Sequence, residues 1–104
     1  MSEKKLALLQ CTSAYPTPDT DANLRVLVSL KRRLKLTIGY SDHTIGSLAL
    51  ETAVALGAEI LEFHFTDSRK GKVFRDHKIS LTPKEVVLLR RNISRISSFL
   101  GDGK

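Results

Sequence analysis

The sequence has few of the residues that mark secreted, membrane-spanning or base-stacking proteins. Cys11 is its only cysteine, which excludes a disulfide within the chain. Tryptophan is absent and aromatic residues make up only 6%, so aliphatic side chains must fill the core. The apolar run near the N-terminus is too short for a signal peptide, and no other run is long enough to cross a bilayer. We therefore expect a cytoplasmic protein that does not contact membranes.

Positive charge exceeds negative charge, with a formal net charge of +6 over 104 residues and a sequence pI of about 9.8. Such charge can attract nucleic acid, lipid or phosphorylated metabolites. The basic residues are scattered over positions 31–33, 69–72 and 90–91, without the interleaved aromatics of a base-stacking surface. We interpret these residues as parts of helix and loop surfaces that face solvent. A nucleic-acid partner, whose affinity would fall steeply with salt, ranks last among the hypotheses.

Three short apolar runs, at 6–12, 36–40 and 59–65, are typical of buried strands, and a helical pattern follows each of them. This alternation predicts repeated right-handed βα units and a parallel sheet, hence an α/β fold. A complete (β/α) barrel of the TIM type needs about 250 residues. We therefore interpret residues 1–104 as one incomplete domain, three consecutive βα units of such a barrel, and as a fragment rather than an open sheet that hides its edges.

The three expected helices differ in how clearly their ends are marked. Apolar residues between positions 24 and 34 recur at helical spacing, and Asp19 and Asp21 supply acidic N-terminal signals. Residues 47–56 form an Ala- and Leu-rich helical stretch before Gly57, a suitable left-handed cap. The third helix opens with a capping box at 82–85 that includes a proline, and its apolar residues recur every three or four positions up to Gly101.

Polar side chains gather where the expected strands end. Ser41 and His43 close the run "TIGYSDHT", and His64 lies near the end of "EILEFHFT". Strand alternation places Glu62 and His64 on one face and Leu61, Phe63 and Phe65 on the other, which should meet the helices. Two imidazoles from neighbouring strand ends could hold a divalent metal ion. The alternative is that each histidine is a hydrogen-bonded structural residue.

Two loops offer further candidates. In "CTSAYPTP", Pro16 stiffens the exit from the first strand, so that Ser13 and Tyr15 either form a rigid turn or present a hydroxyl and a phenol to a polar substrate. In "VFRDHKIS", Asp76 either reaches back to the strand ends or is an ordinary exposed aspartate. Cys11 is interpreted as a small core residue.

Asp42 and His77 lie next to these candidates. We expect them to face solvent or to form local hydrogen bonds.

Four stretches together resemble the sialic acid synthase family, the N-acetylneuraminate synthases and their relatives that make similar nine-carbon acids. They are "QCTSAYPTP" at 10–18, "IGYSDHT" at 38–44, "AVALGAEILEFHFT" at 53–66 and "DHKISLTPKE" at 76–85. They follow the family's order and spacing across nearly the whole chain. The resemblance implies that the chain corresponds to the last three βα units of that family's TIM barrel.

The resemblance also implies a transferase reaction, in which phosphoenolpyruvate condenses with N-acetylmannosamine, its 6-phosphate or a related sugar to give a nonulosonic acid. A divalent metal, most simply Mn²⁺ with Mg²⁺ or Co²⁺ as alternatives, takes part. By this analogy His43 and His64 are the metal ligands. Ser13 and Ser41 contact phosphoenolpyruvate, although many members have asparagine where Ser13 stands. Tyr15 and Asp76 are catalytic residues near the sugar and the metal-bound water.

The family also uses lysines and a glutamate from earlier strands, which these 104 residues do not contain. We therefore expect the chain to be inactive alone. The alternative hypothesis is a non-catalytic truncated paralogue that acts as a self-associating module binding metal or anions. Exposed sheet edges would favour a homo-oligomer in either case.

Overall fold

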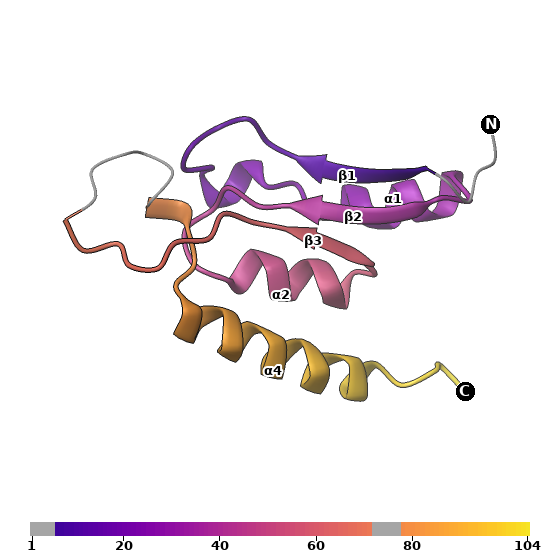
Figure 1. The fold of residues 1–104 in the computed structure, drawn as a ribbon. Coiled ribbons are helices and arrows are strands. Elements are labelled where there is room, and N and C mark those ends of the chain that lie inside the picture. Colours follow the sequence, from indigo (N-terminus) through magenta and orange to yellow (C-terminus); the bar gives the residue numbers. More distant parts are fainter. Residues whose placement is uncertain (1–5, 72–77) are drawn as a thin grey trace.

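The computed structural model describes residues 6–71 and 78–104, and within them three parallel strands form one sheet in the order β1-β2-β3. β1 spans Ala7–Cys11, β2 spans Thr37–Ser41 and β3 spans Ile60–Glu62 (Figure 1). In the register, Cys11 pairs with Ser41 and Ser41 with Glu62, so the carboxyl ends of all three strands lie side by side. The expected α/β fold with a parallel sheet is confirmed.

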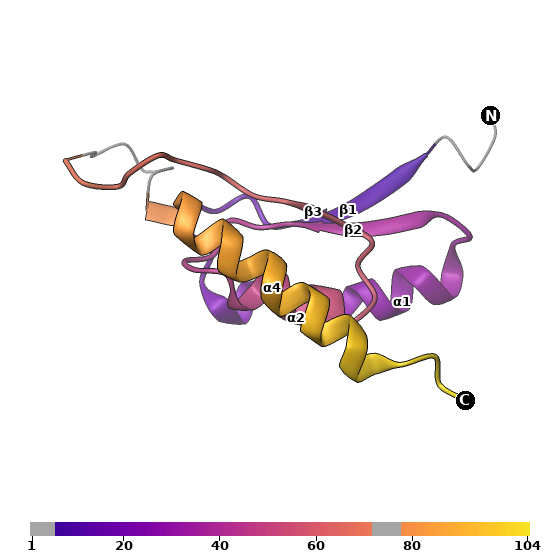
Figure 2. The same cartoon turned by 60° about the horizontal axis from the view of Figure 1, so that its bottom comes forward.

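Three helices lie on one side of this sheet: α1 (Val26–Arg33), α2 (Leu48–Ala55) and α4 (Pro83–Leu100) (Figure 2). α1 and α2 pack against the sheet, and α4 packs on α2. The core between sheet and helices follows from strand alternation, because Ile38 and Tyr40 point toward the helices. It is mostly aliphatic, as the scarcity of aromatics requires. Its fully buried members are Leu27, Ile38, Tyr40, Leu50, Ala53, Leu81 and Leu89.

The sheet face opposite the helices carries no helix of the described residues, and we call it the open face (Figure 2). Alternation against the buried Ile38 and Tyr40 assigns the residues of this face. It comprises Ala7, Leu9 and Cys11 on β1, Thr37, Gly39 and Ser41 on β2, and Ile60 and Glu62 on β3.

The helix ends largely follow the sequence signals. Ser47 precedes α2, and Gly57 follows that helix with a φ of 104°, in the left-handed region. At α4 the capping box is complete: the Thr82 hydroxyl and backbone N–H both donate to Glu85 Oε1, over 3.1 and 2.9 Å. Gly101 ends this helix with a φ of 61°.

The acidic signals before the first helix were misassigned. Asp19 and Asp21 form a separate 3-10 turn, η2 (Asp19–Asp21), and α1 begins only at Val26. Asn23, between the two elements, has a φ of 52°, a left-handed conformation that interrupts the helical path. Leu34, expected within the helix, is instead the extended residue that follows it.

A fourth strand position lies between β3 and α4, where the sequence pattern predicted none. β3 is shorter than expected. Beyond its end, Phe65 forms an isolated parallel bridge with Leu81. Leu81 N donates to His64 O over 2.8 Å, and Thr66 N donates to Leu81 O over 2.9 Å. The third helix therefore follows this fourth position and not β3 itself.

Two residues were misplaced by the sequence analysis. Phe65 was expected against the helices with Leu61 and Phe63, but it lies beyond the end of β3 and is 60% exposed. Cys11 was expected in the core, but it is exposed on the open face at the end of β1. β1 is the edge strand of the sheet, so only one neighbouring strand covers it.

Gly39 allows β3 to lie close to β2. A Cβ atom on Gly39 would lie 2.5 Å from the carbonyl oxygen of Ile60 and 2.9 Å from its Cβ. The nearer of these atoms belongs to the backbone, which cannot rotate away.

We therefore predict that Gly39→Ala destabilises the chain by about 1–3 kcal/mol, the usual cost of overpacking, as measured by urea unfolding. Adding Ile60→Ala should not restore the loss, because the carbonyl oxygen remains in place. An unchanged unfolding midpoint in Gly39→Ala would show that the two strands can separate at no cost.

An ion pair ties the segment after β3 to the first turn of α4. Arg69 Nη1 and Nη2 donate to the two carboxylate oxygens of Glu85 over 2.5 and 3.2 Å, and Nη1 also donates to Ser80 O over 2.8 Å. The hydrogen bond from Arg69, followed by that from the Thr82 backbone, lowers the pKa of Glu85 to about 2. Because this pKa is depressed in the folded state, the ionised carboxylate stabilises the fold above its ordinary pKa, and that contribution disappears as the pH falls to about 2.

We predict that Arg69→Met raises the pKa of Glu85 toward 4.5, its ordinary value, and so reduces the loss of stability between about pH 4.5 and pH 2. Urea unfolding across this pH range measures the change. Arg91→Met, which removes an exposed cation of α4 without touching Glu85, is the control and should keep the wild-type pH dependence. If the free energy of unfolding depends on pH in the same way in wild type and in Arg69→Met, Arg69 does not lower the pKa of Glu85.

Candidate functional site

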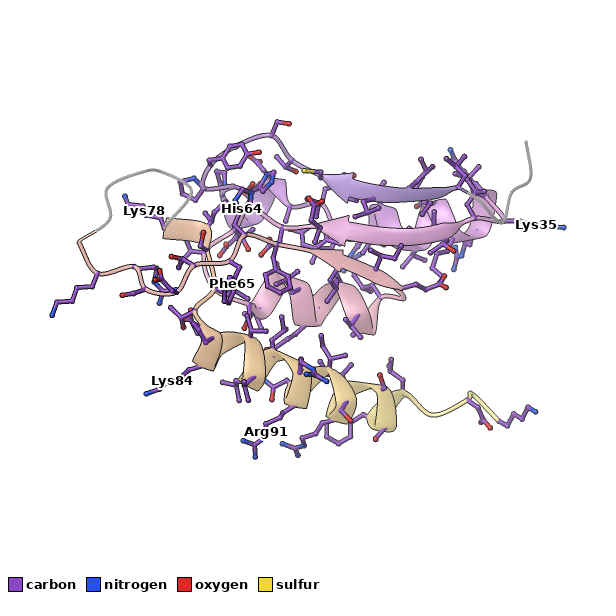
Figure 3. All side chains as sticks on the ribbon, viewed as in Figure 1. Lys35, His64, Phe65, Lys78, Lys84 and Arg91 are labelled. Atoms are coloured by element: carbon purple, nitrogen blue, oxygen red, sulfur yellow. The ribbon has the colours of Figure 1, made fainter. Side chains whose placement is uncertain are left out.

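Three rings meet at the carboxyl ends of the strands. The Tyr15 ring stacks on His43 with the centroids 4.1 Å apart, and His64 meets His43 edge-on at 5.4 Å. Tyr15 also contacts His64 at 5.9 Å between centroids. We call Tyr15, His43 and His64 the ring cluster; His64 is labelled at this end of the sheet in Figure 3. The structure therefore brings together three residues that lie far apart in the sequence.

His43 is oriented by the loop that leaves β1. Its Nδ1 lies 2.9 Å from the carbonyl oxygen of Thr12, which can only accept, so Nδ1 carries the proton. Nε2 then holds the lone pair and can act as a ligand or base. The backbone of His43 is held as well, since Thr17 N donates to His43 O over 2.8 Å.

The loop itself is held by hydroxyl groups. The Thr17 hydroxyl donates to Ala14 O over 2.8 Å, and the Thr12 hydroxyl donates to Asp21 O over 2.8 Å. These bonds keep the backbone around Tyr15 in a fixed turn, so that its ring lies over His43. The structure thus shows the rigid turn, and presentation of the Tyr15 phenol to a substrate stays a prediction.

The residue before His43 is a buried carboxylate. Asp42 is 3% exposed, and its Oδ1 accepts hydrogen bonds from the Tyr40 hydroxyl at 2.8 Å, the Thr44 backbone N–H at 3.0 Å and the Thr44 hydroxyl at 2.7 Å. Burial, followed by the hydrogen bond to Asp42, raises the pKa of Tyr40 well above its ordinary value. Asp42 is thus locally bonded and does not face solvent, and it shapes the turn that carries His43.

Ser41 and Glu62 form a second pair on the open face. The Ser41 hydroxyl donates to Glu62 Oε1 over 2.7 Å, and Asp42 N donates to Glu62 O over 2.9 Å. Ser41 is buried, whereas Glu62 is exposed. The sequence analysis placed Glu62 on the same face as His64 but did not include it among the site residues, although the strand alternation was sufficient to find it.

The remaining expected site residues are Ser13 and Asp76. Ser13 is exposed in the exit loop of β1. Asp76, together with His77, lies outside the described residues. Cys11 is close to the cluster, with Sγ 3.8 Å from His43 Nδ1, a long contact that the shorter bond to Thr12 O outweighs.

A cavity of about 580 Å³ lies elsewhere, between the η2–α1 segment and the start of α2. Its lining is mainly aliphatic and includes the charged side chains of Asp19 and Arg25, but none of the expected site residues. The strand ends are the better candidate site, because the titratable and hydroxyl groups converge there. None of the helices in the part of the chain described is both apolar enough and long enough to span a bilayer.

Comparisons with known proteins give close matches over most of the chain. It is 45% identical over 100 residues to the N,N'-diacetyllegionaminic acid synthase of Campylobacter jejuni, covering 96% of this chain and 30% of that protein. It is 44% identical over 94 residues to the mouse (Mus musculus) N-acetylneuraminate-9-phosphate synthase, covering 89% and 26%. The chain thus spans less than a third of the length of these relatives.

A solved structure of a related protein has the same fold over most of this chain. The N-acetylneuraminic acid synthetase of Leptospira borgpetersenii, crystallised with citrate, superposes with a TM-score of 0.89 at 44% identity, over 94% of this chain and 34% of that one. The family model described as the NeuB family matches residues 1–104. The chain therefore belongs to the NeuB family.

Proposed function

We propose that this chain forms the part of a nonulosonic acid synthase that binds the metal ion and helps to bind phosphoenolpyruvate, which the enzyme condenses with an N-acetylmannosamine-type sugar. One observation carries the proposal: in a member of the NeuB family, the ring cluster and the Ser41–Glu62 pair converge at the carboxyl ends of parallel strands. In α/β folds these ends are where ligands bind. The named activities of the relatives support this substrate class.

The two histidines are suitable for holding a divalent ion. Nε2 of His43 has the lone pair, and the 5.4 Å between the two ring centroids allows both imidazoles to reach one ion, since a metal-bound imidazole has its centre about 3 Å from the metal. No group of three or more His, Cys, Asp or Glu ligands forms within residues 6–71 and 78–104. Two protein ligands with remaining positions for oxygen suit Mn²⁺, Mg²⁺ or Co²⁺. Such an ion, when bound, would polarise the sugar carbonyl as a Lewis acid.

Hydroxyl groups would position the anionic substrate. Ser41 already donates its proton to a carboxylate, and rotation about its C–O bond would allow it to donate to a phosphoenolpyruvate oxygen instead. In the absence of substrate, the hydrogen bond to Glu62 would keep the Ser41 hydroxyl in place. Ser13, in the exit loop of β1, is proposed as a second donor. Tyr15 would line the sugar side of the cluster, where Asp76 is also proposed to act.

The proposal includes inactivity of the isolated chain. Phosphoenolpyruvate carries a carboxylate and a phosphate, which proteins bind with arginine and lysine. Within the part of the chain that the structure describes, the ion pairs are Lys31–Glu59 and Arg69–Glu85, and neither involves the ring cluster. We propose that the cations that bind this substrate come from the rest of a synthase.

We predict that Mn²⁺ binds the wild-type chain in calorimetric titration and that the double variant His43→Ala/His64→Ala shows no such heat. Loss of both imidazoles removes the only proposed protein ligands. Cys11→Ala, next to His43 but outside the proposed ligand set, is the matched control and should bind like wild type. A folded wild-type chain that gives no heat with Mn²⁺ would mean that the strand ends hold no ion without the rest of a synthase.

The catalytic part of the proposal is tested in a chimera. We predict that the purified 104-residue chain releases no phosphate from phosphoenolpyruvate and N-acetylmannosamine with Mn²⁺ present. Substituting it for the aligned 100 residues of the Campylobacter synthase should give an active enzyme on that synthase's own sugar. His43→Ala in the chimera should then lower turnover by at least about 100-fold, more than the loss of an outer-shell group.

Either of two results would refute this proposal. Full turnover by the isolated chain would show that the missing cations are not needed. An inactive chimera that folds and binds Mn²⁺ would show that the segment no longer supports the reaction, leaving the non-catalytic module as the better interpretation.

A further inference from the structure

Residues 40–44, where β2 ends, form a turn that closes on one oxygen atom, and we call it the strand-end turn. Oδ1 of Asp42 accepts from the Tyr40 hydroxyl at one end of this turn. At the other end it accepts from the backbone N–H and the hydroxyl of Thr44. The same oxygen therefore joins both ends of the turn, and His43 lies between them.

Asp42 and the His43 ring lie on different sides of the turn. Because the Tyr40 side chain packs among the helices, the carboxylate that accepts from its hydroxyl lies on that side as well. The His43 ring lies against the exit loop of β1 and against His64. Asp42 can therefore orient the ring only through the backbone of the strand-end turn.

The backbone of Asp42 also joins this turn to the segment that leads to His64. Asp42 N donates to Glu62 O over 2.9 Å, one step beyond Ser41 and Glu62, the last paired residues of β2 and β3. His64 follows Glu62 by two positions in the sequence. The side chain of Asp42 thus shapes the turn that carries one proposed ligand, and its N–H ties that turn to the segment that carries the other.

We propose that Asp42 is a positioning residue for the metal ion, because its Oδ1 shapes the turn that holds the His43 imidazole 5.4 Å from that of His64 between ring centroids. The inference rests on the proposed metal site. Asp42 acts as a hydrogen-bond acceptor, so an amide oxygen in its place can accept the same bonds. Groups that orient metal ligands commonly change the affinity for the ion by about 10- to 100-fold.

Calorimetric titration with Mn²⁺ tests the side chain. In Asp42→Ala the affinity should fall by at least about 10-fold, because the turn loses the oxygen on which it closes. Asp42→Asn keeps an acceptor there and should remain within about 2-fold of wild type. The titrations are run where circular dichroism shows every variant to be folded. A residue that only stabilised the fold would leave the affinity of folded molecules unchanged.

A milder pair of variants covers the case in which Asp42→Ala does not fold. Thr44→Val removes one donor to Asp42 and keeps the size of a buried side chain, so it should weaken Mn²⁺ binding by about 5-fold. Ile93→Val is the matched control. It shortens a side chain that packs against the core from α4, costs a modest amount of stability, and should bind Mn²⁺ like wild type.

A measurement without metal separates this inference from the proposed function. Nuclear Overhauser effects between the ring protons of Tyr15 and His43 report the stacked pair, whose centroids are 4.1 Å apart. They should persist in Asp42→Asn, weaken in Thr44→Val and disappear in Asp42→Ala. If the wild-type chain binds no Mn²⁺, the proposed metal site fails, and these effects still decide whether Asp42 places the His43 ring.

Three results would overturn the proposal. The first is an Asp42→Ala chain that binds Mn²⁺ like wild type or keeps the ring contacts. The second is a loss in Asp42→Asn as large as that in Asp42→Ala, which would assign the effect to the charge. The third is a Thr44→Val chain that cannot be told from Ile93→Val in either measurement.

Discussion

The whole cluster depends on the hydrogen bonds between His43 and the exit loop of β1. The imidazole donates to Thr12 O, and the backbone carbonyl of the same residue accepts from Thr17 N. These two bonds join neighbouring strands beyond the point where the sheet ladder ends. They fix which imidazole nitrogen carries the proton, and they hold Tyr15 over the ring. The hydroxyl bonds of Thr12 and Thr17 hold the loop within itself, and these two bonds attach it to His43.

Buried polar groups elsewhere in this region have the same function of holding the backbone. Asp42 is almost fully buried and would be costly there without partners, yet one of its oxygens accepts three hydrogen bonds. Tyr40 is anchored in the apolar core at its ring and reaches Asp42 with its hydroxyl. Core packing is thereby transmitted directly to the turn that carries His43. Stability of the core and geometry of the site are consequently linked in this chain.

The sequence predicted the features that depend on local chemistry. Strand alternation placed Glu62 and His64 on one face of their strand, and the capping box at Thr82 and Glu85 gave the start of α4. It could not predict the features that depend on which strand lies at an edge. Cys11 ends an apolar strand in the sequence, but it is exposed because β1 has one partner strand. Phe65 follows the alternation of β3, but that strand ends before it. The role of Leu81 as a strand position is carried by one bridge, too short to leave a periodic pattern.

The core joins segments that are distant in sequence, because α1 packs against β2 and α4 packs on α2. The chain superposes closely with the Leptospira synthetase over 94% of its own length and 34% of that structure. At the strand ends, the His43 imidazole and the Ser41 hydroxyl are each held by a hydrogen bond to a neighbouring segment. The rings of Tyr15 and His64 are placed by their contacts with His43. The geometry of the strand ends is therefore set by contacts among β1, β2, β3 and the loops that leave them, all within the described residues.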